Sequence, residues 1–323
     1  MSTPSMRLIR ELVSTACLAP SVENTQPWSW RIVADDTVEL SADRTRQLVS
    51  VDPLGRELVV SCGAALDHFV VAADSFGLTA TVEEFPGGDD RDLLARVRLG
   101  PGVLSDAGVE RLAAMENRHT DRRGSSNWPV PVDRVERLGQ TATRGGARVI
   151  VLTDPWSTYR TEQLVEVARQ ALLHDPVVSA EQDAWVDRSD VEGVPGIVAA
   201  PSHELEKHRV PTRFDRNAAT PPHSERPDVL AAICTDHDDP RAWLWAGRCL
   251  SAFWLAATAG GLALTPTTQV LEVNRTRMLL QHDVFGGLLH PQVLVRVGWP
   301  AAAAGRPTAR RTGRRPVEDV LEA

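Results

Sequence analysis

The sequence predicts an α+β fold built from two similar halves. Helical apolar spacing surrounds a few short strand-like segments in each half of the chain. Each half also holds one long apolar helix, predicted over 55–76 and 241–264, which carries or is closely followed by a Gly-Leu pair, Gly77-Leu78 or Gly261-Leu262. A strand or turn follows each pair. This recurrence indicates a duplication, although the similarity between the halves is weak.

The individual elements follow from local patterns. Apolar residues three and four positions apart predict helices, and Ser105 or Asp106 is a suitable N-cap for one of them. Gly77 is a suitable residue to follow the C-terminus of the first long helix. Alternating or continuous apolar runs between turn residues predict strands. The helices are expected over 7–18, 55–76, 105–117, 132–138, 158–173 and 241–264, and the strands over 30–33, 38–40, 79–83, 94–99, 149–152, 229–235 and 293–297.

Composition limits the class of protein. The 323 residues suit two domains or one large duplicated domain, and 42% of them are hydrophobic. A formal net charge of −8 argues against nucleic acid as the main partner. The four Cys form no C-x-x-C pair and are expected to be reduced, buried thiols in a cytoplasmic protein. The uncharged stretch 249–270 contains Gly, Pro, Ser and Thr, and is read as a core helix and turn, with no membrane span or signal peptide expected.

The segment 19–30 joins a helix end to a strand through a polar loop. Asn24 and Gln26 could hydrogen-bond to the edge of a heterocycle, and Trp28 offers a flat apolar wall. The alternative, favoured by the residues alone, is a capped turn with an anchoring Trp.

The segment 118–123 gathers three Arg, a His and a Thr, which together could bind an anion. Guanidinium groups bind phosphate with two parallel hydrogen bonds, and Thr120 adds a hydroxyl donor. Because Lys207 is the only Lys of the chain, any phosphate site here would be built from Arg. The alternative is a solvated, charged helix end.

Two further segments lie in the second half. Residues 260–269 place glycines, small hydroxyl groups and Pro266 after a buried helix, which could cover a ligand or simply end the helix. Residues 310–320 form a basic tail that carries little information alone.

Together the four segments resemble the nitroreductase family of FMN-binding proteins. The resemblance implies that Arg118, His119, Thr120, Arg122 and Arg314 hold the FMN phosphate. It further implies that the turn at Pro266, Thr267, Thr268 and Gln269 lies along the flavin ring. The loop with Pro20, Ser21, Asn24, Gln26 and Trp28 looks like the one that reaches FMN from the neighbouring subunit in the family's usual dimer.

The loop and the phosphate motif each occur once here, in different halves of one chain. This resembles the Acg subgroup, known from actinobacteria, and implies two tandem nitroreductase-like halves packed as an intramolecular pseudo-dimer. Each half is expected to be a mainly antiparallel sheet flanked by helices, over 1–104 and 105–323, in a monomer with one FMN site. Trp185 and Arg188 are candidates for reading the flavin's polar edge, and the polar segment 203–228 is either a lid or a surface loop.

Two functions are therefore weighed. One is an oxidoreductase, in which NAD(P)H reduces FMN and the flavin reduces a small acceptor such as a nitro compound or quinone. The other is an FMN storage or sequestration protein, with a lid that keeps the nicotinamide away. A scaffold without flavin is the third reading. No catalytic side chain is nominated, and no spacing matches a metal site.

Overall fold

The structure is a computed structural model that describes residues 4–88, 90–120, 125–126, 128–196, 228–300 and 312–322. The segment 203–227, expected as a lid or loop, and the predicted phosphate-site residue Arg122 lie outside these ranges.

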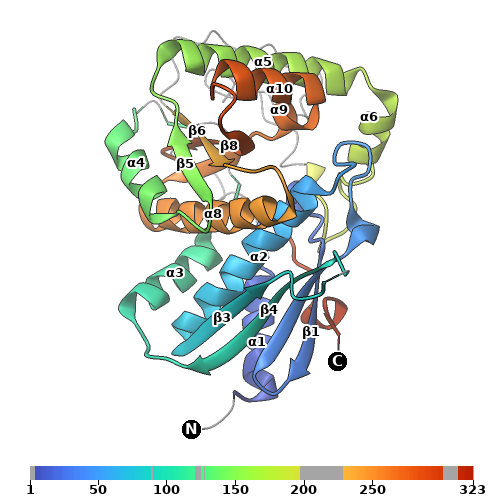
Figure 1. Ribbon diagram of the computed structural model, residues 1–323, viewed down its shortest axis with the longest axis vertical. Coiled ribbons are helices and arrows are strands. Elements are labelled where there is room, and N and C mark those ends of the chain that lie inside the picture. Colours follow the sequence, from blue (N-terminus) through green and yellow to red (C-terminus); the bar gives the residue numbers. More distant parts are fainter. Residues whose placement is uncertain are drawn as a thin grey trace.

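Two layers of strands are separated by a pair of long helices (Figure 1). The first sheet has the order β3-β4-β2-β1-β9. Neighbouring strands are antiparallel, except that β9 pairs with β1 in parallel. Its strands are β1 (Trp28–Ala34), β2 (Thr37–Ala42), β3 (Leu78–Glu84), β4 (Leu93–Pro101) and β9 (Leu321–Glu322).

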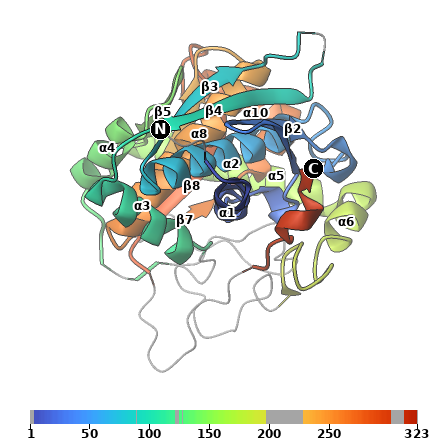
Figure 2. The ribbon, with the colours of Figure 1, turned by 90° about the horizontal axis from the view of Figure 1, so that it is seen from below.

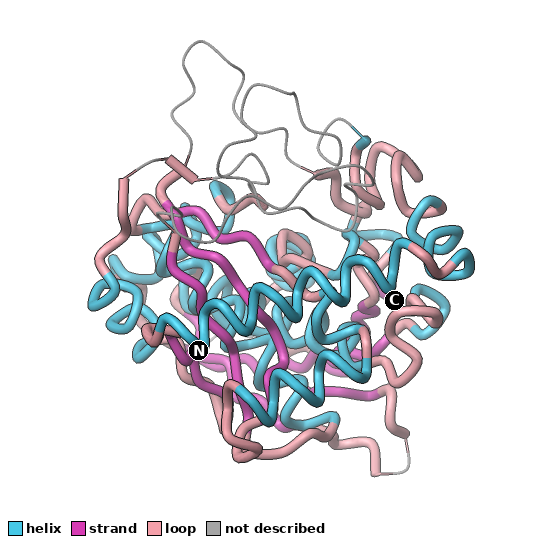
Figure 3. The backbone as a smooth tube through the Cα atoms, turned by 90° about the horizontal axis from the view of Figure 1, so that it is seen from above, coloured by secondary structure: helices cyan, strands magenta, loops and turns pink. Residues whose placement is uncertain are grey.

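The second sheet has the order β5-β6-β8-β7 and is antiparallel throughout. Its strands are β5 (Ala147–Val151), β6 (Val229–Thr235), β7 (Ala263–Pro266) and β8 (His290–Gly298). The long helix α5 (Pro155–Leu173) crosses over this sheet (Figure 3), and its buried Leu164 and Val165 belong to the same core cluster as strand residues. The shorter helices here are α4 (Val132–Thr141), α6 (Pro176–Asp183), α9 (Gln269–Glu272) and α10 (Asn274–Asp283).

Read from its β7 edge, the second sheet repeats the strand order of the first. The order β7-β8-β6-β5 matches β3-β4-β2-β1 in chain position as well as in pairing. The matched connections differ in length. Residues 35–36 join β1 to β2, whereas α5 and α6 lie between β5 and β6.

Helices α2 (Arg56–Ser75) and α8 (Pro240–Ala259) cross at the centre of the protein and share one hydrophobic core. Both contain 20 residues, and each has a glycine at its eighth position. A Cβ at Gly63 would lie 2.2 Å from Leu244 O, and a Cβ at Gly247 would lie 1.9 Å from Val60 O. The two backbones therefore touch reciprocally, as in an interface between equivalent elements.

Helix α2 is also long and apolar enough to cross a membrane by length and composition, but 89% of its apolar window is buried inside the protein. Two more helices, α1 (Met6–Ala16) and α3 (Asp106–Asn117), pack against it. The Ser105 side chain accepts a hydrogen bond from Gly108 N–H, which confirms it as the N-cap of α3. All four Cys are free and buried, as expected.

Three sequence expectations need correction. The helix predicted to run to residue 264 ends at Ala259, because Gly261 takes a left-handed φ of 75° and the chain then enters β7. The expected turn over 265–269 is the end of β7 followed by α9. Strand β9 and helices α9 and α10 were not predicted.

Candidate functional site

The predicted loop 19–28 meets two other segments that are distant from it in the sequence. One of them, the C-terminal segment that begins at Thr312, passes beside α1 (Figure 2) before β9 joins the first sheet. The backbone N–H of Trp30 donates to Val320 O at 2.7 Å, and this hydrogen bond holds the C-terminal segment against β1. The third segment is the turn 185–194, closed by a bridge between Val186 and Val194.

Asn24 and Gln26 hold this junction together with their side-chain amides. Asn24 Nδ2 donates to Gly193 O at 3.1 Å and to Gly313 O at 3.2 Å, and its Oδ1 accepts from Arg314 at 3.0 Å. Gln26 Nε2 donates to Val191 O at 2.8 Å, and its Oε1 accepts from the backbone N–H of Arg315 at 2.8 Å. Both amides, predicted to meet a heterocycle, are thus engaged with protein.

The loop backbone is unusual for residues other than glycine. Glu23, Asn24 and Gln26 have φ angles of 44°, 57° and 51°. Left-handed backbone of this kind persists only where surrounding contacts fix it, and it concentrates at functional sites. The Ser21 hydroxyl accepts from Gln26 N–H at 3.0 Å, and the Ser61 hydroxyl of α2 accepts from Val22 N–H at 3.1 Å.

Arg118 and Arg314, far apart in the sequence, converge on one carbonyl at the end of α1. Arg118 donates to Leu18 O at 3.1 Å and Arg314 donates to the same oxygen at 3.2 Å. The Arg118 guanidinium also lies 4.6 Å from the ring centroid of Trp254 on α8. The structure therefore brings together the two predicted arginines whose placement it describes.

The charge of Arg314 is poorly compensated. Its described hydrogen-bond acceptors are oxygens of neutral groups, and none is a carboxylate. Desolvation lowers the pKa of Arg314 to about 10, and its buried Nε has no hydrogen-bond partner among the described residues. Such a guanidinium can accept an anion at little cost.

The other predicted residues vary in position. His119 and Thr120 are half-buried, and His119 Nδ1 lies 3.0 Å from Asn117 O. Trp28 is fully buried at the start of β1, consistent with an anchoring role. Within the 266–269 segment, Thr267 N–H donates to Leu294 O at 2.8 Å and the Thr268 hydroxyl to Glu272 at 2.8 Å.

The two candidates in the turn 185–194 contact each other. The Arg188 guanidinium lies 4.2 Å from the ring centroid of Trp185, and Arg188 Nε pairs with Glu192 at 3.1 Å. Pro20 and Ser21, which belong to the loop 19–28, are half-buried.

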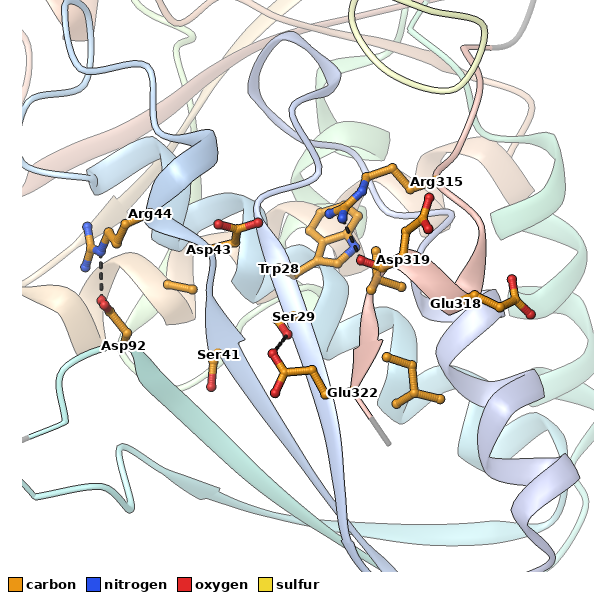
Figure 4. Close-up of a pocket in the computed structure, with 13 residues that line it drawn as sticks. Trp28, Ser29, Ser41, Asp43, Arg44, Asp92, Arg315, Glu318, Asp319 and Glu322 are labelled. Carbon is orange, nitrogen blue, oxygen red and sulfur yellow. Dashed lines mark hydrogen bonds and ion pairs between the residues drawn. The ribbon is translucent and has the colours of Figure 1, made fainter.

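A hollow of about 500 Å³ opens where β1, β2 and the C-terminal segment meet (Figure 4). Carboxylates outnumber guanidinium groups in its lining, which contains Asp43, Asp92, Glu318, Asp319 and Glu322 against Arg44 and Arg315. This balance disfavours a phosphate dianion. Within the described ranges, no three His, Cys, Asp or Glu side chains are grouped to hold a metal ion.

Comparison with known proteins gives the family. The chain is 39% identical over 319 residues to "Putative NAD(P)H nitroreductase Rv3131" of Mycobacterium tuberculosis, covering 95% of this chain and 90% of that protein. It is 35% identical to "Putative NAD(P)H nitroreductase acg" of the same organism, covering 97% and 95%. The chain belongs to the Acg-type, nitroreductase-like family. No protein-family model matches it.

The overlap with solved structures is partial for this Acg-type chain. The nitroreductase with bound FMN from Bacteroides fragilis shares 12% identity and a TM-score of 0.40, covering 62% of this chain and 94% of that one.

Three residues that interact with the predicted arginines or with the loop carried no signal in the sequence of this Acg-type protein. Trp254 lies in an apolar helix whose pattern explains it as core, and Arg315 was one of several Arg in the tail. His68 is fully buried on α2 and gave no motif signal. Burial, the largest effect, and then the charges of Arg118 and Arg314 lower the pKa of His68 well below its usual range.

Proposed function

We propose that this chain is a flavoprotein that binds one FMN, with the FMN phosphate at Arg118 and Arg314. The observation that carries the proposal is the convergence of these two arginines on Leu18 O, beside a loop held in left-handed backbone. Family membership supports it, because the named relatives are called NAD(P)H nitroreductases.

The donor set fits a phosphate dianion. Two guanidinium groups supply positive charge, and the hydroxyls of Thr120 and Thr312 stand next to or close to them in sequence. Arg314 Nε is a buried donor without a partner among the described residues, and the acceptors on Arg314 are neutral. A dianion would supply the missing negative charge and replace weak acceptors with strong ones.

The loop's role in this proposal is to shape the site. Because both side-chain amides are committed to Gly193, Gly313, Val191 and Arg315, they fix the loop to the other two segments. That leaves the loop's surface, with Pro20 and Ser21, as the part that would face the flavin. His119, Arg122 and the segment 266–269 remain proposed FMN contacts.

We further propose that the chain is an intramolecular pseudo-dimer whose halves are 1–104 and 105–323. The repeated strand order and the reciprocal contacts at Gly63 and Gly247 support this division. The C-terminal segment then crosses from the second half to the first, which brings Arg314 to the loop. Such a chain needs no second copy to complete its site, so a monomer is expected.

The proposed activity is an NAD(P)H-dependent reduction of a small acceptor, such as a nitro compound or quinone. Bound FMN would supply the hydride and electron transfer. The protein's part is to hold the phosphate by two arginines and to keep the loop wall rigid. The proposed lid, residues 203–228, would decide whether the nicotinamide gains access.

The visible spectrum of the purified protein, before and after anaerobic NAD(P)H, tests the proposal. A flavin band at one FMN per chain that bleaches with NAD(P)H supports the oxidoreductase. A band that bleaches only with dithionite points to storage instead. The variant pair R118Q and R314Q should lose the band, whereas R44Q, on the exposed Arg44–Asp92 pair, should keep it. Failure of wild-type protein to bind added FMN would refute the flavoprotein assignment.

A further inference from the structure

The ring of Trp254 on α8 lies against the guanidinium group of Arg118. The guanidinium carbon is 4.6 Å from the ring centroid, within the distance at which an aromatic face attracts a cation. Both residues are buried, with Trp254 1% exposed and Arg118 6% exposed. The attraction is strongest for Trp among the aromatic residues, and it grows when the pair is withdrawn from water. The indole therefore stabilises the buried charge of Arg118.

Helix packing fixes the backbones that carry this pair. Arg118 directly follows α3, and its backbone N–H donates to Ala114 O at 2.8 Å. Ala114 and Met115 of α3 share a buried cluster with Leu255, the residue that follows Trp254 on α8. The guanidinium group and the indole thus extend from two helices whose relative placement is set by a common core.

An aromatic partner stabilises a guanidinium group without using its donors. The N–H groups lie in the guanidinium plane, whereas the ring attracts the cation through its π-face. A carboxylate partner would neutralise the charge and occupy N–H groups. With Trp254 against it, Arg118 donates to Leu18 O at 3.1 Å, and the same oxygen accepts from Arg314 at 3.2 Å. The arrangement keeps the charge of Arg118 beside that of Arg314.

The crossing of the two central helices does not itself require a Trp at this position. Trp254 is seven residues after Gly247, and the residue seven positions after Gly63 is Val70. Each is the fifteenth residue of its helix, and Val70 is half-buried. The matching position of α2 thus has a smaller aliphatic side chain, and the aromatic one is on the helix that faces Arg118.

We propose that Trp254 is a positioning residue of the phosphate site, which holds the Arg118 guanidinium group beside Arg314 before FMN binds. The proposal rests on the proposed function. Trp254 acts through Arg118 and has no contact with the flavin. Without the indole, the long side chain of Arg118 adopts several rotamers in the ligand-free protein, and binding of the phosphate then has to restrict them. Riboflavin, which lacks the phosphate, does not bear this cost.

Flavin fluorescence titration of the full-length chain with FMN and with riboflavin separates positioning from packing. W254L should raise the Kd for FMN about 3- to 10-fold, the cost of ordering one long side chain, and should change the Kd for riboflavin by less than about twofold. W254F keeps a ring with a weaker attraction for cations, so its Kd for FMN should lie between those of the wild type and W254L.

Trp243 provides the matched control. It is a buried Trp of the same helix, and its indole N–H donates to Asp238 at 2.7 Å. W243F should therefore keep the Kd for FMN within about twofold of the wild type. If W254L does not fold, W254M carries the same prediction, because its flexible thioether side chain fills irregular gaps in a core.

A double-mutant cycle shows whether Trp254 acts through Arg118. R118Q should still bind FMN through the flavin ring, and W254F should then cause no further loss beyond about twofold. The proposal is overturned by an unchanged Kd for FMN in the aliphatic variant, by equal losses for FMN and riboflavin, by an equal loss in W243F, or by an undiminished loss in the R118Q background. Wild-type protein that binds no FMN, or R118Q that binds FMN as the wild type does, would instead overturn the proposed function.

Discussion

A methyl group at Gly247 would be forced into the backbone of the opposite helix. Its Cβ would lie 1.9 Å from Val60 O and 2.8 Å from the Val60 carbonyl carbon. Overpacking costs about 1–3 kcal/mol, and backbone on the receiving side favours the upper end. Replacing a helical glycine with alanine returns about 1 kcal/mol. The net loss for G247A is therefore about 2 kcal/mol, a fall in Tm of about 3 °C for a chain of 323 residues.

Urea or thermal unfolding of G247A, G63A and the double variant measures this. Because a single separation of α2 from α8 relieves both contacts, the double variant should lose less stability than the two single losses added together. Ala113, exposed on α3, provides the control: A113G isolates the helix-propensity difference, expected at about 1 kcal/mol. Either single alanine variant within about 0.5 kcal/mol of wild type would refute a close crossing at these glycines.

Three further outcomes are expected. R314Q should weaken FMN binding about 10- to 100-fold by fluorescence titration, while riboflavin affinity stays unchanged, because one charge-assisted contact to phosphate is worth about 1.5–3 kcal/mol; equal losses for both ligands would contradict the phosphate role. N24A should lower stability by about 2–4 kcal/mol in urea unfolding, since three hydrogen bonds are lost and alanine tolerates the positive φ poorly; a neutral N24A would contradict the junction. Burial acts to raise the pKa of Glu39, but the hydrogen bonds that its carboxylate accepts from Arg31 and Arg96 outweigh this effect, so its pKa is lowered. The stabilisation that ionised Glu39 gives to the fold is therefore complete above the ordinary pKa range of glutamate, and it is lost as pH falls through the lowered pKa. E39Q should reduce Tm at neutral pH, and its Tm should approach that of the wild type in acid.

The elements that could be predicted from the sequence are those whose pattern is set by a buried face. Helix α2 was predicted over 55–76 and spans Arg56–Ser75, because nearly every turn carries apolar residues and Gly77 ends it with a φ of 71°. Strand β6 was predicted over 229–235 and spans Val229–Thr235, because it is buried along its whole length. Strand β9 has two residues, too few for an alternation, and its pairing depends on β1 almost 300 positions earlier.

In the candidate site, too, some features follow from residue type and others depend on distant contacts. Residue type alone left the cluster at Arg118 open between an anion site and a solvated helix end, and Arg314 was proposed from the family resemblance. The structure brings these two arginines to one carbonyl, and their role toward FMN stays a prediction. Residue type could not identify the partners of Asn24 and Gln26, because an amide bonds equally well to a ligand or to a distant backbone. Those partners, Gly193 and Gly313 among them, are set by tertiary contacts that leave no local pattern.

Corresponding positions on the two central helices explain why a duplicated chain would retain one site. The sixth residue of α2 is Ser61, whose small hydroxyl accepts from Val22 N–H and leaves room for the loop before β1. The sixth residue of α8 is Trp245, whose ring occupies the space where a Cβ on Gly145 would lie, 2.5 Å away, in the loop before β5. The Trp245 indole N–H is fixed at 2.8 Å by a carboxylate of β3, Glu84. In the proposed pseudo-dimer, one side thus holds a strained polar loop beside two arginines, and the other is filled by an indole, which favours the proposed single FMN per chain.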